Sequence, residues 1–167
     1  MGYYVRKISR SKWPDKPCDI KLLKSDAIAD IRTQGNDLSV WKIDDLSQLD
    51  HAALALACSS KTEKIESITL VWIDEDEIIR YGIDVDATQP GDTIIPDLAV
   101  GHRNFSNLTY GKLGDISNLI MKEIGTDCCK RYTRSTLRDF FKSAFDDHKI
   151  DEAKCMPKLL EDIKKIA

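Results

Sequence analysis

The first 81 residues alternate between strand-like and helix-like spacing of apolar side chains. Residues 3–8, 38–43 and 65–73 are rich in β-branched and aromatic residues, which predicts three strands. The second half of residues 65–73 is apolar on both faces, as in a strand at the middle of a sheet. Each pair of strands is separated by residues with helical spacing.

Two helices are predicted between these strands. The first has apolar positions at Ile20, Leu23, Ala27, Ile28 and Ile31, with an alternative start at Ser25-Asp26, and it ends at Gly35-Asn36. The second begins at Asp44-Asp45, where Asp45 and Gln48 have capping-box spacing, and its apolar face holds Leu46, Leu49, Ala53 and Leu56.

Three further helices are predicted in the last third of the chain. Their apolar stripes are Leu113, Ile116, Ile120 and Ile124, then Leu137, Phe140, Phe141, Ala144 and Phe145, then Leu159, Leu160, Ile163 and Ile166. Gly125 ends the first, Ser135 or Thr136 caps the second, and Pro157 lies in the first turn of the third.

The predicted fold class is therefore α/β, with α+β as the alternative, in one domain covering residues 1–167. Residues 1–81 form a small mixed sheet of three to four strands in the order β-α-β-α-β, with a parallel, right-handed crossover before the last strand. Residues 82–111, which are rich in Gly, Pro and polar side chains, form a long irregular connection. Residues 112–167 form a helical part packed on this core.

Composition places the chain among ordinary globular proteins, with 42% apolar and 32% charged residues in 167. The longest uncharged apolar run, residues 52–58, is too short to cross a bilayer, and charges interrupt the first eleven residues as they would not in a signal peptide. The five cysteines form no Cys-x-x-Cys pair, which is typical of reduced thiols. We expect a soluble, cytoplasmic protein with no membrane contact, and its oligomeric state is left open.

Charge is distributed unevenly along the chain. The net charge of -3 divides into +5 for residues 1–24, -10 for residues 25–125 and +2 for residues 126–167. Such opposed blocks either attract each other within the fold or present different faces to partners.

A run of acids follows the predicted central strand. Asp74, Asp76 and Glu77 are candidate ligands for Mg²⁺ or Mn²⁺, because ligand sites in open α/β sheets gather at the carboxyl ends of strands. The alternative is that these acids cap a short helix and pair with Arg80.

The candidate catalytic residues are Asp97, His102 and Arg103, in the long connection. A histidine exchanges protons near neutral pH, an arginine grips a phosphate or carboxylate through two hydrogen bonds, and an aspartate can orient the imidazole. The alternative is that His102 and Arg103 bind loop carbonyls. His51 and His148 are predicted to be solvent-facing or structural.

A basic stretch supplies the third candidate. If a helix began early, Arg131, Arg134 and Arg138 would share a face that could bind an anion or nucleic acid. The adjacent Cys128 and Cys129 are predicted to be inert buried thiols rather than reactive ones. Trp13, Trp41 and Trp72 are predicted to be core or loop-anchoring aromatics, with an exposed Trp13 as the alternative.

The sequence lacks the motifs of the common nucleotide-binding, zinc-protease and serine-hydrolase sites. We therefore expect an interaction or regulatory protein that works by binding another protein, with no cofactor. The first alternative is a small hydrolase or phosphotransfer enzyme that uses His102 and Arg103 with nearby carboxylates, with Mg²⁺ or Mn²⁺ as its metal. The second is a nucleic-acid-binding protein, which the net negative charge disfavours. Whether the chain is an enzyme is thus left undecided.

Overall fold

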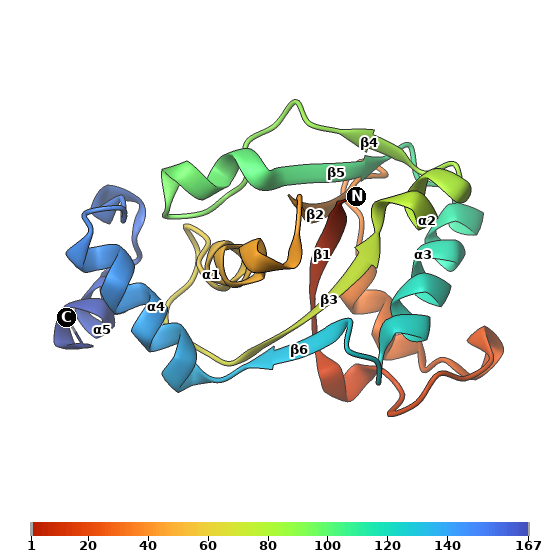
Figure 1. The fold of residues 1–167 in the computed structure, drawn as a ribbon, viewed down its shortest axis with the longest axis horizontal. Helices are drawn as coiled ribbons and strands as arrows, with labels where there is room; N and C mark the ends of the chain where they lie inside the picture. The colour runs from red at the N-terminus through yellow and green to blue at the C-terminus, as the bar shows by residue number, and fades with distance from the viewer. Residues whose placement is uncertain (1, 167) are drawn as a thin grey trace.

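The chain is organised around one sheet that runs through the middle of the molecule (Figure 1). In the computed structural model, which describes residues 2–166, six strands form this sheet in the order β4-β5-β2-β1-β3-β6. Their bounds are Tyr3–Ile8 (β1), Leu38–Ile43 (β2), Ile68–Asp74 (β3), Asp84–Asp86 (β4), His102–Ser106 (β5) and Cys129–Tyr132 (β6). All neighbours within this described sheet pair antiparallel.

The fold is the α+β alternative, whereas the predicted small mixed sheet is wrong, because the sheet has six strands and is antiparallel. Strand β1 lies between β2 and β3 and is antiparallel to both. Strands β2 and β3 therefore run in the same direction without touching each other, and the chain that connects them passes through α1 (Leu49–Ala57). The order of elements along the chain predicted that this crossover joins two neighbouring strands of the sheet. In the structure β1 lies between the two strands that it joins.

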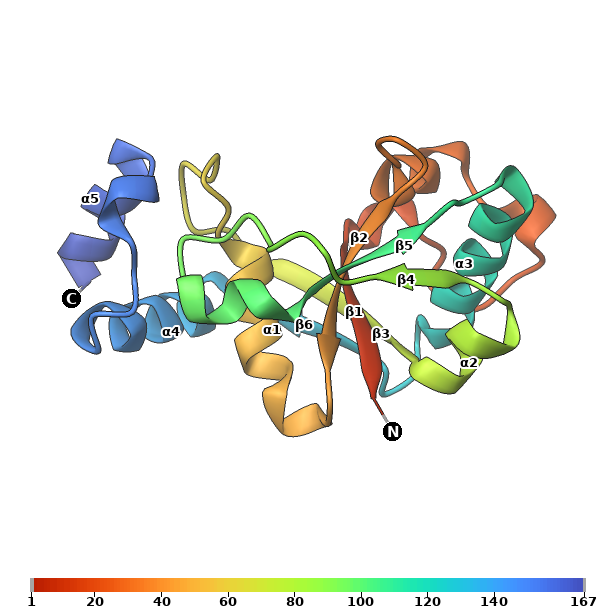
Figure 2. The same cartoon turned by 90° about the horizontal axis from the view of Figure 1, so that it is seen from above.

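One face of the sheet is covered by α1, α4 (Arg134–Asp146) and α5 (Pro157–Ile166). Val5, Leu70 and Trp72 point from the sheet into this layer. Leu137, Phe141, Leu159 and Ile163 meet them from the helices. Figure 2 shows this helical layer on the left of the sheet, with the C-terminus at its far end.

The other face is covered by α3 (Tyr110–Glu123), α2 (Glu75–Arg80) and the segment that follows β1. Tyr4, Val71 and Ile73 point into this second layer, on the right of the sheet in Figure 2. The segment after β1 contributes Trp13 and Ile31, which are 3% and 2% exposed. All three tryptophans are buried, so the prediction of core or anchoring aromatics is confirmed.

The helix predicted over residues 20–31 is wrong in type. The segment after β1 holds short 3₁₀ turns instead: η1 (Arg10–Lys12), η2 (Ile20–Leu22) and η3 (Ser25–Ile31). Gly35 and Asn36 do not end a helix but form a two-residue turn with φ of 63° and 67°. Gln34 and Asp37 exchange both backbone hydrogen bonds across it. Consecutive residues with positive φ are typical of tight hairpin turns, and Gly-Asn accepts this geometry.

The irregular connection predicted over residues 82–111 is also corrected. It contains β4, the 3₁₀ helix η5 (Pro96–Gly101) and β5, which together build one edge of the sheet. Polar residues at His102 and Asn104 concealed β5, although both are buried. At the opposite edge, β6 occupies residues where an early helix was considered, and α4 begins only at Arg134 behind a Thr133 cap.

The remaining helices lie where the sequence predicted them, although Thr133, and not Ser135 or Thr136, caps α4. Helices α3, α4 and α5 carry the predicted stripes, and Pro157 is the first residue of α5. The second predicted helix begins as a 3₁₀ turn, η4 (Leu46–Gln48), where Asp45 accepts a hydrogen bond from the Ser47 amide. Within residues 2–166, no helix combines the length and apolar character needed to cross a membrane.

Candidate functional site

A pocket of about 410 Å³ opens where β2 ends, between η5 and the start of α1. Its apolar wall includes Trp41 and Leu98. Its charged and polar side chains come from elements far apart in sequence: Lys42, Asp44, Gln48, His51, Asp97 and Arg103. The pocket therefore contains two of the three candidate catalytic residues, Asp97 and Arg103.

The indole of Trp41 forms a fixed side of this pocket. Its Nε1–H donates a hydrogen bond to the carbonyl of Leu98 at 3.1 Å. Gly91 and Gly101 pack directly on the ring, since a Cβ at either position would lie 2.1 Å or 2.7 Å from indole atoms. The two glycines let the chain between β4 and β5 approach the tryptophan, and this contact fixes the position of η5.

Arg103 is held at the pocket by one end of its guanidinium. Nη1 donates to the carbonyls of Val100 and His102, at 2.7 and 2.6 Å. Within residues 2–166, Nε and Nη2 have no hydrogen-bond partner and the guanidinium forms no ion pair. Nε and Nη2 together make the edge of a guanidinium that binds a carboxylate or phosphate through two hydrogen bonds.

Lys42 is committed to a neighbouring carboxylate. Its Nζ lies 2.6 Å from Oε1 of Glu75, which also accepts a hydrogen bond from the hydroxyl of Tyr4 at 3.2 Å. The hydrogen bond from Lys42 is the main reason that the pKa of Glu75 lies below its usual value. Burial, together with the charge of Glu75, raises the pKa of Tyr4 to about 12. The charge of Lys42 is therefore paired within the described residues, whereas the charge of Arg103 is not.

His51 is one of the pocket residues that sequence reasoning missed, together with Lys42, Asp44 and Gln48. It lies in the first turn of α1 and, like Asp97, borders both this pocket and an adjoining hollow of about 320 Å³ that reaches Phe140 on α4. The prediction of a solvent-facing side chain agrees with its exposure, but exposure does not exclude a place in a pocket. The signal was available, because the first turn of a helix after a strand faces the end of that strand.

His102 does not join Asp97 and Arg103. Its side chain is buried, its Nδ1–H donates to the carbonyl of Gln89 at 2.9 Å, and its ring packs edge-on against Trp41 with centroids 5.4 Å apart. It borders a different hollow, beside Asn104. Successive residues of a strand point to opposite faces, so His102 and Arg103 diverge once both are in β5. A catalytic role for the three residues stays a prediction.

The acids after β3 are engaged locally. Asp74 accepts a hydrogen bond from the Asp76 amide at 2.9 Å as the N-cap of α2, and Glu77 pairs with Arg80 at 2.6 Å. Among the residues that the structure describes, no group of three or more His, Cys, Asp or Glu side chains is placed to hold a metal. The arrangement is that of the capping alternative.

The basic stretch is divided among different elements. Arg131 lies on the edge strand β6, 3.4 Å from the hydroxyl of Ser67, while Arg134 is the first residue of α4 and pairs with Asp162 at 3.7 Å. Arg138 is half-buried, with its Nε unpartnered. The three arginines therefore do not share one helix face. Cys128 and Cys129 are half-buried rather than buried, and burial raises the pKa of both thiols, which disfavours the reactive thiolate.

Another hollow, of about 340 Å³, lies between α3 and the 3₁₀ turns η2 and η3, and we call it the α3 groove. Its walls carry Ile20, Leu23, Ile28, Ile31, Tyr110, Leu113 and the small residues Ser25, Gly114 and Ser117. Tyr110 is 90% exposed and Ile28 is 52% exposed. Lys24 is the charged side chain of the lining, and no ion pair involves it within residues 2–166.

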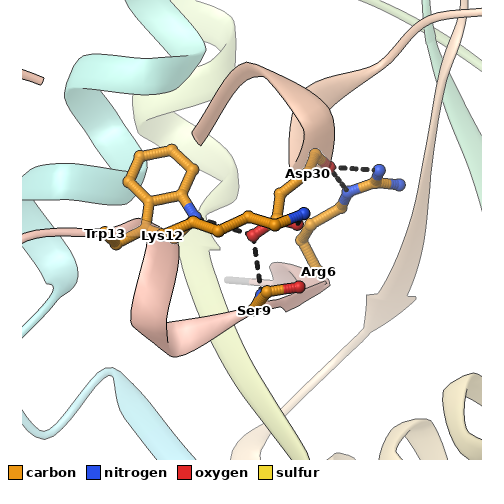
Figure 3. Close-up of polar contacts among 5 residues, drawn as sticks. All are labelled: Arg6, Ser9, Lys12, Trp13 and Asp30. Carbon is orange, nitrogen blue, oxygen red and sulfur yellow. Dashed lines mark hydrogen bonds and ion pairs between the residues drawn. The ribbon is translucent and has the colours of Figure 1, made fainter. Parts of the chain in front are cut away.

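The outer wall of the α3 groove is fastened by Asp30 (Figure 3). Its carboxylate accepts hydrogen bonds from the Ser9 amide at 2.6 Å and from the Trp13 indole at 2.9 Å, and it pairs with Lys12 at 3.3 Å. Its backbone carbonyl accepts from Nε of Arg6 at 3.1 Å. One residue of η3 is thus tied to β1 and to η1.

Comparison with known proteins gives no relative. No protein-family model, no curated protein and no solved structure matches the chain.

Proposed function

We propose that the chain works by binding another protein, and that the α3 groove receives a segment of this partner. The observation that carries the proposal is the exposure of large apolar side chains on both walls of one hollow, Ile28 from η3 and Tyr110 from α3. Apolar side chains gathered around a hollow are typical of protein interaction sites.

The lining of the groove indicates the chemistry of the partner. Apolar residues on both walls fit the apolar face of an amphipathic helix, which buries side chains spaced by three or four residues. Lys24 adds one positive charge without an ionic partner in the described chain. We therefore assign the groove to an amphipathic helix of the partner with a carboxylate at the border of its apolar face.

Rigidity of the wall supports the same proposal. Asp30 fixes η3 to β1 and η1 through the contacts of Figure 3, so the groove needs little ordering when a partner binds. A preformed site loses less conformational entropy on binding than a flexible one.

The test begins with a photo-reactive amino acid at position 28 of the full chain, which captures whatever occupies the groove. The captured protein is identified by mass spectrometry and purified, and its affinity is measured for Ile28→Asp and Lys24→Glu. Ile79→Asp is the matched control, since Ile79 is 69% exposed on α2 and lies outside the groove, and Lys61→Glu is the control for charge.

Each outcome decides the proposal. We expect a captured protein of different sequence whose affinity falls roughly tenfold with each groove variant and stays unchanged with both controls. Capture of a second copy of this chain alone, or of nothing, contradicts the proposal. So does a partner that binds Lys24→Glu as well as the unmodified chain.

A further inference from the structure

The geometry points to a second binding site, in the pocket beside Arg103, that takes a small zwitterion of the α-amino acid type. This pocket lies at the end of β2 and shares no lining residue with the α3 groove. The inference is therefore independent of the proposed function. It rests on a guanidinium edge and two carboxylates that face one pocket without pairing.

The guanidinium supplies the anion site. Its Nη1 is anchored to the carbonyls of Val100 and His102, which fixes the orientation of the half-buried Arg103 side chain. The edge made of Nε and Nη2 keeps its donors free within the described residues. A planar fork that is already fixed binds a carboxylate at a lower entropic cost than a mobile side chain does.

The carboxylates supply the cation site. Asp44, at the end of β2, and Asp97, in η5, line the same pocket, and within residues 2–166 neither forms an ion pair. Because neither pairs with Arg103, the opposite charges are held apart in one hollow. A ligand with only a negative charge would meet two carboxylates, whereas a ligand with both charges satisfies the guanidinium and an acid together.

The size and the wall of the pocket define the ligand further. The pocket has a volume of about 410 Å³, which is larger than one amino acid, and it is open to solvent, so an amino acid can enter it. Trp41, which the glycines Gly91 and Gly101 hold in place, and Leu98 form the apolar wall. We therefore assign the site to an α-amino acid with an apolar side chain, and we expect L-leucine to bind more tightly than glycine.

The binding test is a titration of the ¹⁵N-labelled full chain with L-leucine, read at the Trp41 indole N–H and the Gly101 amide. N-acetyl-L-leucine lacks the positive charge and L-leucinamide lacks the negative one, and each is expected to bind roughly tenfold more weakly than L-leucine. Equal binding of either analogue overturns the zwitterion assignment. Absence of shifts with L-leucine overturns the site.

Variants locate the two charges. Arg103→Lys keeps the positive charge but loses the two-donor edge, and Asp97→Asn removes a negative charge at an exposed position. We expect each to weaken L-leucine binding roughly tenfold, and the matched control Arg80→Lys on α2 to leave it unchanged. Unchanged binding to both pocket variants overturns the assignment. If Arg103→Lys disturbs the fold, Asp97→Asn still tests the site, because Asp97 is exposed.

Discussion

The indole Nε1 of Trp13 donates a hydrogen bond to the carboxylate of Asp30 at 2.9 Å, and both side chains are almost completely withdrawn from solvent. Trp13 follows η1 and Asp30 lies in the last turn of η3, so this contact ties the two ends of the segment between β1 and β2 together (Figure 3). This segment forms one wall of the α3 groove.

Asp30→Ala is expected to lower the free energy of unfolding by ~1–3 kcal/mol, because the buried Trp13 indole is left without an acceptor and the exposed Ser9 amide also loses its hydrogen bond. Urea unfolding measures the loss, and hydrogen exchange of residues 20–31 is expected to speed up. Asp19→Ala is the control, since Asp19 caps η2 from an exposed position. An equal loss in both variants would contradict the special role of Asp30.

The contribution of Asp30 also depends on pH. Burial by itself raises the pKa of this carboxyl, but the hydrogen bonds from Ser9, Trp13 and Lys12 outweigh it, so the pKa lies below its ordinary value of 3.8. The folded state then binds the proton less readily than the unfolded state. The stability that the ionised Asp30 contributes is fully present above the ordinary pKa, and it is lost as the pH falls through the lower folded pKa.

We therefore expect the difference in unfolding free energy between the unmodified chain and Asp30→Asn to narrow as the pH falls from neutral to about 3. Urea titrations at a series of pH values measure it. A difference that stays constant or widens on acidification would show that the folded carboxyl does not have a lowered pKa.

Gly91 and Gly101 are expected to reject a side chain. Gly91→Ala and Gly101→Ala would each place a methyl group against the Trp41 indole. We expect the free energy of unfolding to fall by ~1–3 kcal/mol and the melting temperature to fall with it. L-leucine binding at the neighbouring pocket should weaken as well. The control is Gly111→Ala, whose methyl would have its nearest neighbour, Thr109 Oγ1, at 3.8 Å. Melting curves that match the control would refute this packing.

Gly114 is expected to separate stability from binding. It lies inside α3, and an added Cβ meets no atom within 4 Å, so Gly114→Ala should stabilise the fold by ~0.5–1 kcal/mol. Gly114 lines the α3 groove, so the same methyl group lies in the groove and should lower the affinity for the captured partner. Gly111→Ala, also in α3 but outside the groove lining, should leave partner affinity unchanged. Equal affinity of Gly114→Ala and Gly111→Ala would argue against the groove.

Tyr132 joins the edge strand β6 to α1. Its hydroxyl donates to Asp50 at 2.6 Å, and the Nζ of Lys130 lies 4.5 Å from the ring centroid. Tyr132→Phe removes this hydrogen bond, and we expect a loss of ~0.5–1.5 kcal/mol in unfolding free energy. Tyr81→Phe, at a partly exposed position after α2, is the control and should be neutral. A neutral Tyr132→Phe would mean that water replaces the bond at no cost.

The sequence by itself determined the elements whose pattern is local. Strands β1 and β2 have the predicted bounds, β3 overlaps its predicted run but starts three residues later and ends one residue later, and α3 to α5 carry the predicted stripes. Side-chain alternation and helical spacing fix these features within a few residues of chain, so no distant contact is needed to recognise them.

Only the tertiary structure decided which elements meet. Strand β1 inserts between β2 and β3, and polar β5 becomes a strand because β2 and β4 supply its hydrogen bonds. The same pairing sends His102 and Arg103 apart, while the packing of α1 against η5 places His51 near Asp97. These outcomes depend on contacts between residues far apart in sequence, and a local pattern holds no information about the partner of a strand.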